Sequence, residues 1–262
     1  MKGKTNFRQL AFVIILLLSP STLLSARNFR FAQISDTHIR PDYTTIDDLK
    51  LTVAQINSMD SVDFVLVTGD ITHKGDKESI IIAKQILDSL DIPYYVIPGN
   101  HDTKFGEQCI VDFVEVFGAS NFIFQHDSCA FVGINTGQLN SSNGRVGDEE
   151  LLWLDSVLNG LPVDMTKFII SHHPLQEDDI DNFQDLSNVL MQHRISCILS
   201  GHYHINMIFD CMGIPDVVTR TNQRGKQRLS GFSIIAIDND NISWTEYNPD
   251  GKYNTWLELK LE

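Results

Sequence analysis

The sequence predicts an α/β layered domain in which helices cover a central sheet or sheets. Short apolar runs alternate with amphipathic segments up to about residue 200. Apolar runs of this kind are typical of strands that are buried on both faces. After Gly201 the pattern changes to strands with few intervening helices. A strand–helix alternation followed by strands favours a sheet core with helices outside it.

Apolar periodicity predicts strands and helices in succession along the chain. Residues 28–35 alternate like a strand, and 63–68 form a nearly all-apolar strand. Residues 46–59 carry apolar side chains at helical spacing, and 148–158 begin with an acidic turn that favours the helix dipole. The remaining predicted strands are 93–97, 122–125, 129–135, 167–171, 196–199, 205–209, 217–219, 232–237, 242–247 and 255–261, and the remaining helices are 79–90 and about 183–193.

Composition limits the classes of function. A chain of 262 residues with 42% hydrophobic content is expected to form one domain with an ordinary core. Its net charge of −14 argues against sequence-independent nucleic-acid binding or adhesion to anionic membranes, because both need a basic face. A small phosphate substrate stays compatible, since bound metal ions can supply local positive charge.

The N-terminus has the pattern of a targeting segment. Lys2, Lys4 and Arg8 precede the apolar run 10–18, which is too short to span a bilayer. We therefore predict a signal peptide over residues 1–26, a mature domain over 27–262, and export to the periplasm or the medium. An uncleaved N-terminal anchor is the alternative. The mature chain is expected to contain no membrane span.

Four cysteines lie in the predicted mature region: Cys109, Cys129, Cys197 and Cys211. Their even number in an exported chain permits two disulfides. Buried free thiols are the other interpretation, because a fold of this size does not need covalent staples.

Residues of metal-ligand type follow five of the predicted strands. In an open α/β sheet, the loops beyond the carboxyl ends of the strands form the ligand-binding crevice, so we expect these side chains to converge. The seven candidate metal ligands are Asp36, His38, Asp70, Asn100, His172, His202 and His204.

The chemistry of these side chains favours a pair of transition-metal ions. Carboxylate and carboxamide oxygens together with imidazole nitrogens suit Mn, Fe or Zn. Seven ligands are too many for one such ion and suit two that share a bridge, for which Asp70 is the natural candidate. Two ions can clamp a phosphoryl group and lower the pKa of a bound water until it attacks as hydroxide.

The five motifs, in this order, resemble those of the calcineurin-like metallophosphoesterases. They are Asp36-x-His38, Gly69-Asp70, Gly99-Asn100-His101-Asp102, His172-x-Pro174 and Gly201-His202-x-His204. The resemblance implies a four-layer αββα sandwich of two β-sheets flanked by helices. It is closest to the bacterial branch of cyclic-nucleotide and glycerophosphodiester phosphodiesterases. Position 73 carries histidine where purple acid phosphatases carry tyrosine, so no ferric–tyrosinate site is expected.

The resemblance also assigns roles to single residues. Asp36, His38 and His204 would hold one metal, Asn100, His172 and His202 the other, and Asp70 would bridge them. His101 would stabilise the phosphoryl oxygens or protonate the leaving alkoxide, and Asp102 would orient its ring. The His-x-Pro pattern favours His172 over His173 as the ligand. His73, His173 and Tyr203 are further candidates for substrate binding.

The predicted function is that of an exported hydrolase acting on a small phosphodiester or phosphomonoester. Two alternatives stay open: a nucleotide pyrophosphatase of the same superfamily, or a metal-free binding module of the same fold. Substrate choice is expected to lie in the loops 138–145 and 176–185. The sequence carries no indication of the natural substrate or of the oligomeric state.

Overall fold

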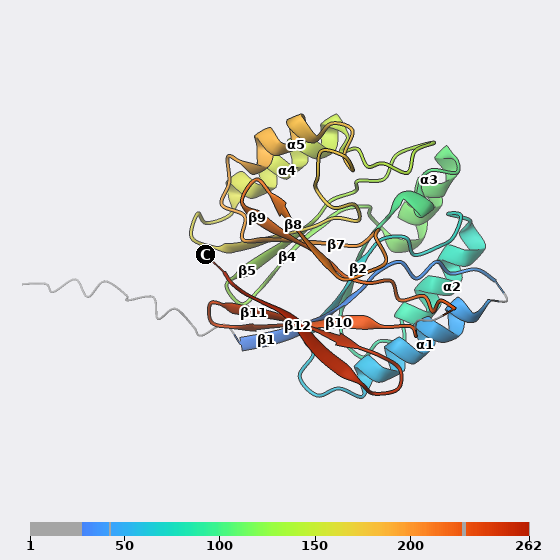
Figure 1. The fold of residues 1–262 in the computed structure, drawn as a ribbon. Helices are drawn as coiled ribbons and strands as arrows, with labels where there is room; N and C mark the ends of the chain where they lie inside the picture. Colours follow the sequence, from blue (N-terminus) through green and yellow to red (C-terminus); the bar gives the residue numbers. More distant parts are fainter. Residues whose placement is uncertain (1–27, 42, 227–228, 262) are drawn as a thin grey trace, which may run out of the picture.

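The computed structural model describes residues 28–41, 43–226 and 229–261. Two six-stranded sheets pack face to face, and helices cover their outer faces (Figure 1). The predicted four-layer αββα sandwich is confirmed. The predicted signal peptide lies outside the described residues.

The first sheet has a parallel core extended by antiparallel strands. Its order is β12-β11-β10-β1-β2-β3, with β1–β2–β3 parallel and β10 antiparallel to β1. The three parallel strands are nearly all apolar and bring their carboxyl ends to one edge. The strands are β1 (Asn28–Ile34), β2 (Phe64–Thr68), β3 (Tyr94–Ile97), β10 (Phe232–Asp238), β11 (Asn241–Tyr247) and β12 (Tyr253–Lys260).

The second sheet has the order β4-β5-β6-β7-β9-β8, with β5, β6, β7 and β9 parallel. As predicted, β4 and β5 are paired strands, and they are antiparallel. The strands are β4 (Phe122–His126), β5 (Cys129–Gly133), β6 (Thr166–Ile170), β7 (Cys197–Ser200), β8 (Met207–Cys211) and β9 (Ile214–Val218).

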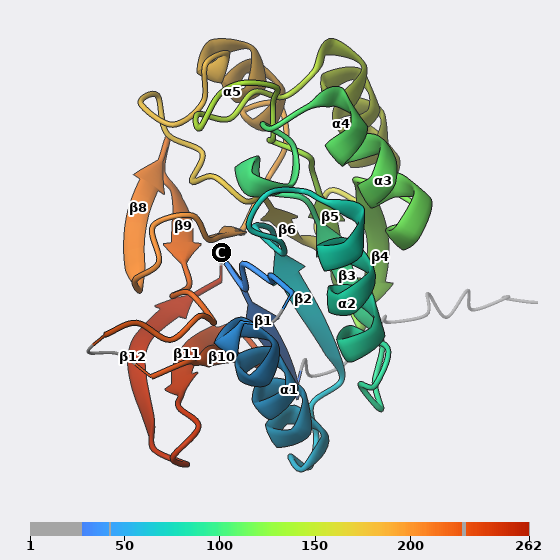
Figure 2. The same cartoon turned by 90° about the vertical axis from the view of Figure 1, so that its right-hand side faces the viewer.

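Three hydrophobic clusters hold the layers together. One lies between the sheets and is rich in aromatic side chains, among them Phe31, Phe131 and Trp244. The other two lie between each sheet and its helices. Figure 2 shows α1 and α2 against the first sheet, with the loops at the carboxyl ends of the strands gathered at one end. The helices are α1 (Thr44–Asn57), α2 (Lys77–Leu87), α3 (Glu107–Phe117), α4 (Asp148–Gly160) and α5 (Phe183–Leu190), with a short 3₁₀ turn, η1 (Asn100–Asp102).

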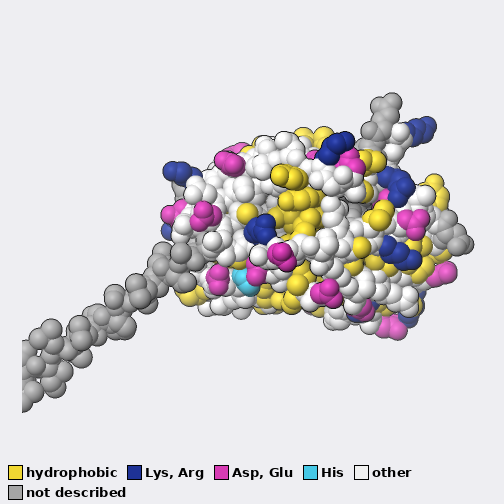
Figure 3. Space-filling view, turned by 90° about the horizontal axis from the view of Figure 1, so that it is seen from below, with side chains coloured by type: hydrophobic (Ala, Val, Ile, Leu, Met, Phe, Trp, Pro, Cys, Tyr) yellow, Lys and Arg dark blue, Asp and Glu magenta, His cyan; other side chains and the backbone are white. Residues whose placement is uncertain are grey.

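All four cysteines are buried and none of them forms a disulfide, so the disulfide alternative is wrong. Among the described residues, no helix is both long and apolar enough to cross a bilayer. On the face shown in Figure 3, charged side chains of both signs are scattered around a hollow that exposes hydrophobic side chains.

Candidate metal centre

Both sheets deliver the seven candidate ligands to one place. The loops after β1, β2 and β3 carry Asp36, His38, Asp70 and Asn100, and the loops after β6 and β7 carry the three histidines. All seven side chains therefore start at carboxyl ends of parallel strands, as the sequence predicts. The centre lies where the two sheets meet.

Five of the seven ligands have a left-handed backbone. This conformation is uncommon for residues other than glycine and is often found at functional sites. It turns each side chain sharply out of its strand direction, back toward the neighbouring loops. The φ values are 54° for Asp36, 45° for His38, 50° for Asp70, 69° for His202 and 62° for His204.

The first cluster is made by Asp36, His38, Asp70 and His204, whose ligand atoms lie within 4.8 Å of one another. The Nε2 atoms of His38 and His204 are 3.1 Å apart. Asp36 Oδ1 lies 3.1 Å from His204 Nε2, while its Oδ2 accepts hydrogen bonds from Ser35 Oγ and the His202 backbone. One carboxylate oxygen of Asp36 is thus anchored and the other faces the histidines.

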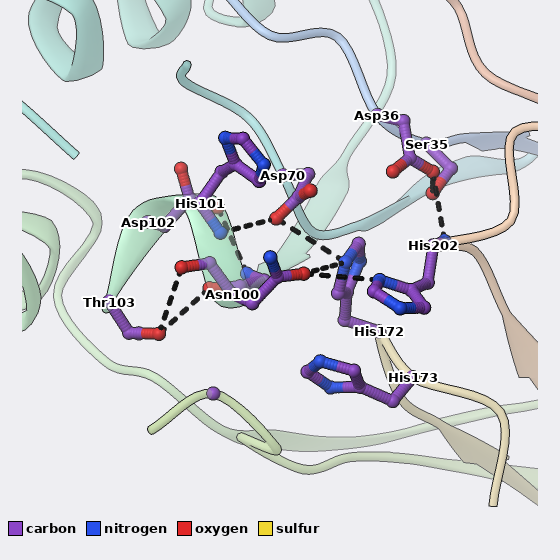
Figure 4. Close-up of polar contacts among 12 residues, drawn as sticks. Ser35, Asp36, Asp70, Asn100, His101, Asp102, Thr103, His172, His173 and His202 are labelled. Atoms are coloured by element: carbon purple, nitrogen blue, oxygen red, sulfur yellow. Dashed lines mark hydrogen bonds and ion pairs between the residues drawn. The ribbon is translucent and has the colours of Figure 1, made fainter. Parts of the chain in front are cut away.

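The second cluster is built around the Asn100 side chain. Its Oδ1 lies 3.1 Å from both His172 Nε2 and His202 Nδ1, and the three side chains point toward one another (Figure 4). His172 Nδ1 donates to the Thr68 carbonyl over 2.8 Å. Because this bond fixes the proton on Nδ1, it leaves the Nε2 lone pair free for a cation.

Asp70 lies between the two clusters and turns a different oxygen to each. Its Oδ2 is 3.8 Å from His38 Nε2, and its Oδ1 is 3.3 Å from His172 Nε2. The Oδ1 atom also accepts the His101 backbone N–H over 2.7 Å. A carboxylate placed in this way can serve two ions at once.

The electrostatics match a site made for cations. Burial lowers the pKa of His172, but the adjacent Asp70 carboxylate outweighs this and raises it to about 9. Burial, reinforced by charge on His172, lowers the pKa of His202 to about 4, and burial lowers that of His38 to about 4. The buried carboxylates of Asp36 and Asp70 need positive charge nearby. A protonated His172 supplies only part of that charge. Carboxylate, carboxamide and imidazole donors fit Mn, Fe or Zn in that place.

Two glycines allow these loops to approach closely. Gly69 has a φ of +86°, and a Cβ there would lie 2.7 Å from His172 Nδ1. At Gly99 a Cβ would lie 2.3 Å from Asp70 Oδ1, so a side chain would displace the Asp70 carboxylate. Close approach therefore explains Gly99, while Gly69 needs both the space and the left-handed backbone.

The expected role of Asp102 is wrong. Its carboxylate accepts hydrogen bonds from the backbone of Ile71, Thr72 and Gly99 and from the Thr72 hydroxyl. The His101 ring is instead held by the His73 carbonyl, 2.8 Å from Nδ1. Asp102 ties the loop after β2 to the loop after β3, and so positions Asp70 and Asn100.

The His173 ring is held by protein groups at both of its nitrogens. It is fully buried, with Nδ1 2.8 Å from Thr136 Oγ1 and Nε2 3.0 Å from the Ser142 carbonyl. Because both ring nitrogens have protein partners, the expected substrate contact is replaced by a supporting role: His173 holds the loop 138–145.

Tyr203 and His73 lie at the rim of the site. Tyr203 is 41% exposed, and its hydroxyl donates to Asp179, so it joins the loops after β6 and β7. The His73 ring lies 5.5 Å from that of His101 and 6.0 Å from that of His38, between centroids. Both positions border the space beside the two clusters.

Some supporting residues have no recognisable sequence signal. Thr221, in the β-rich tail, donates its hydroxyl to the Asp36 carbonyl over 2.7 Å. Gln33 is fully buried between the sheets and donates to the Ser200 carbonyl. Isolated polar residues in strands and turns carry no spacing that distinguishes them from ordinary surface residues, so only the fold identifies them.

Comparisons with known proteins agree with this geometry. The family model "Calcineurin-like phosphoesterase" matches residues 29–206. A probable glycerophosphodiester phosphodiesterase from Arcobacter nitrofigilis is 30% identical over 66% of this chain and 70% of its own. A probable cyclic nucleotide phosphodiesterase from Vesicomyosocius okutanii is 31% identical over 71% of this chain and 83% of its own.

A solved structure has the same fold. The dimetal phosphatase from Danio rerio superposes with a TM-score of 0.70 at 16% identity, over 89% of this chain and 99% of its own. At this identity the likeness concerns the fold alone. The sequence match over residues 29–206 and the two phosphodiesterase relatives lead to the same conclusion: this chain belongs to the calcineurin-like phosphoesterase family, a family of hydrolases acting on phosphoric ester bonds.

Proposed function

We propose that this protein is an exported phosphodiesterase whose centre holds two transition-metal ions. The observation that carries the proposal is the Asp70 carboxylate, which turns one oxygen to each of two ligand clusters. In a site for a single ion, the ligand carboxylate would direct one or both of its oxygens to that ion alone, and not to two separate clusters.

The chain offers a separate ligand set for each ion. Asp36, His38 and His204 would hold one, Asn100, His172 and His202 the other, and Asp70 would bridge them. Two such ions supply Lewis-acid activation of a phosphoryl group and of water.

His101 is the residue best placed to act on the leaving group. Its Nδ1 is turned to the His73 carbonyl and its backbone N–H is bonded to Asp70, so both the ring and the main chain are fixed beside the bridge. With Nδ1–H donating to the carbonyl, Nε2 is the atom that can carry a proton to a departing alkoxide.

A diester is proposed over a monoester because both relatives described above are named as phosphodiesterases. Export is proposed from the basic and apolar pattern of residues 1–26 alone.

The test is to measure metal content and hydrolysis of bis(p-nitrophenyl) phosphate on the purified protein, with added Mn²⁺, Zn²⁺ or Fe²⁺ and with a chelator. We expect two ions per chain and turnover that the chelator abolishes. Asp70→Asn should bind at most one ion and lose at least 100-fold in kcat, since it removes the shared ligand. Asp164→Asn, which removes one negative charge from an exposed residue in the turn before β6, is the matched control and should leave both unchanged.

Each other outcome has a defined meaning. A single bound ion in an active protein contradicts the dinuclear centre. Activity only on a nucleotide pyrophosphate bond supports the pyrophosphatase alternative. A folded protein that binds no metal and hydrolyses no ester supports the binding module.

A further inference from the structure

A basic rim lies beside the first ligand cluster. The Ile39 N–H donates to the Ile71 carbonyl over 2.8 Å, and the His73 N–H donates to the Ile39 carbonyl over 3.1 Å. This pairing continues the parallel β1–β2 contact past the metal ligands. It brings Arg40, the next residue after Ile39, beside His73.

Arg40 is held in place without a charged partner. Its guanidinium carbon lies 3.7 Å above the centroid of the Tyr43 ring, which is half exposed. Its Nε–H group is buried and donates a hydrogen bond to no acceptor among the described residues. Among the described residues, no carboxylate pairs with Arg40, whereas Arg220 pairs with Glu246 and Arg224 with Asp48. Stacking fixes the guanidinium without using its terminal NH₂ groups, which are the donors left to bind a ligand because Nε is buried.

Positive charge accumulates at this point. The pKa of His73 is lowered first by burial and then by the nearby charges of Arg40, His101 and Lys74. This happens in a chain whose net charge is −14. The rim of Arg40 and Lys74 is therefore a small positively charged region on a protein whose net charge is negative.

An acidic loop lies beside the second ligand cluster, where Tyr203 joins it to the His202 loop. The loop 176–182 follows the His172 strand and carries Glu177, Asp178 and Asp179. It is fixed to the loop 138–145 by two backbone hydrogen bonds, from the Gly144 N–H to the Asp179 carbonyl and from the Asp181 N–H to the Gly144 carbonyl. Asp179 also accepts the Tyr203 hydroxyl. Basic residues thus follow His38 at the first cluster, and an acidic loop follows His172 and His173 at the second.

We propose that Arg40, supported by Lys74, is an anion subsite that selects phosphodiesters in which one alcohol bears a second anionic group, a carboxylate or a phosphate. This rests on the proposed phosphodiesterase function. The acidic loop at the second cluster repels that end of the substrate and the basic rim at the first attracts it, so an asymmetric diester binds in one orientation. The guanidinium fork suits either anion.

The test uses substrates that differ only in one charge. They are 4-nitrophenyl phenyl phosphate and its analogues with a carboxylate or a trimethylammonium group at the 4-position of the phenyl ring. Water adds to phosphorus, the bond to the 4-nitrophenyl oxygen breaks, and nitrophenolate leaves in every case. An analogue with a phosphonomethyl group in place of the carboxylate shows whether the subsite prefers a dianionic group to a carboxylate. We expect kcat/KM to be about tenfold higher for the carboxylate than for the neutral substrate, and lower for the cation.

The variants assign that preference to Arg40. Arg40→Gln should reduce the carboxylate-to-neutral ratio to about one, and Arg40→Lys should keep part of it. Arg194→Gln removes the same charge from an exposed residue at the opposite end of β7 and should keep the full ratio. In the wild type, raising the salt concentration should reduce the ratio, which needs no variant.

The outcomes separate the two proposals. A ratio near one in the wild type, or a ratio that Arg40→Gln leaves unchanged, overturns the anion subsite while the phosphodiesterase stands. Equal losses on both substrates in Arg40→Gln also overturn it, because Arg40 would then serve the common phosphoryl group. No metal-dependent hydrolysis of any substrate overturns the phosphodiesterase function and the subsite with it.

Discussion

Replacing Asp102 by asparagine should mainly destabilise the metal centre and leave the His101 ring in place. The carboxylate accepts four hydrogen bonds, from three backbone N–H groups and one hydroxyl. An asparagine oxygen can accept about half of them, and its NH₂ group would face the other donors. Each buried donor left without an acceptor costs about 1–3 kcal/mol, so two cost about 2–6 kcal/mol. Removing a buried charge offsets part of this, and we expect a net loss of about 2–4 kcal/mol.

Denaturant unfolding of the wild type and Asp102→Asn, each saturated with metal, measures that loss through the transition midpoint. The metal affinity should fall as well, because Asp102 ties the loops of Asp70 and Asn100 together. The matched control, Asp164→Asn, should stay within about 0.5 kcal/mol of the wild type. An unchanged midpoint together with a reduced kcat would refute this reasoning and would restore Asp102 as the residue that orients His101.

Three further predictions concern the same framework. Gly99→Ala places a Cβ 2.3 Å from Asp70 Oδ1 and should weaken the metal affinity, measured by titration, at least tenfold. Gly147→Ala, with no atom within 4 Å of its Cβ, is the control and should leave the affinity unchanged. Equal affinities of the two variants would contradict the close approach at Gly99. Burial raises the pKa of Asp216 to about 6 from 3.8, so its carboxyl stabilises the fold below pH 3.8 and this stabilisation is lost as the pH rises through 6. The difference in unfolding free energy between the wild type and Asp216→Asn should therefore change by about 2 kcal/mol from pH 4 to pH 7.5, and a constant difference would exclude the shift. Chelation should lower the melting temperature, with recovery that increases with metal concentration; a melting temperature independent of metal would argue against tight binding to the native state.

The sequence predicts most of the fold because the apolar runs and the ligand motifs indicate the same strand ends. Asp36, Asp70 and His172 each follow a buried strand, and only a layered sheet brings such positions together. Every predicted strand and helix exists, with ends that shift by at most three residues. The helix α3 is absent from the predicted elements. Its sequence EQCIVDFVEVF is rich in β-branched and aromatic residues, which favour strands locally, while packing of Phe113 against the first sheet makes it a helix.

The site is predicted less completely than the fold. The seven ligands carry recognisable spacing, and the structure brings them together in two clusters. The roles of Asp102 and His173 depend on which atoms lie beside them in three dimensions, and sequence spacing cannot encode that. For the same reason, Arg40 has no motif: it becomes visible only when backbone pairing places it next to His73.

The position of the centre at the junction of the two sheets has a mechanical consequence. Each ligand set combines residues from both sheets: Asp36 and His38 with His204, and Asn100 with His172 and His202. A bound ion in either set would therefore act as a non-covalent cross-link between layers that are otherwise joined by side-chain packing and by hydrogen bonds such as that from Gln33 to the Ser200 carbonyl. Sliding of one sheet over the other would distort both coordination shells at once. The ions would then act on rigidity as well as on chemistry, in a chain whose cysteines form no such link.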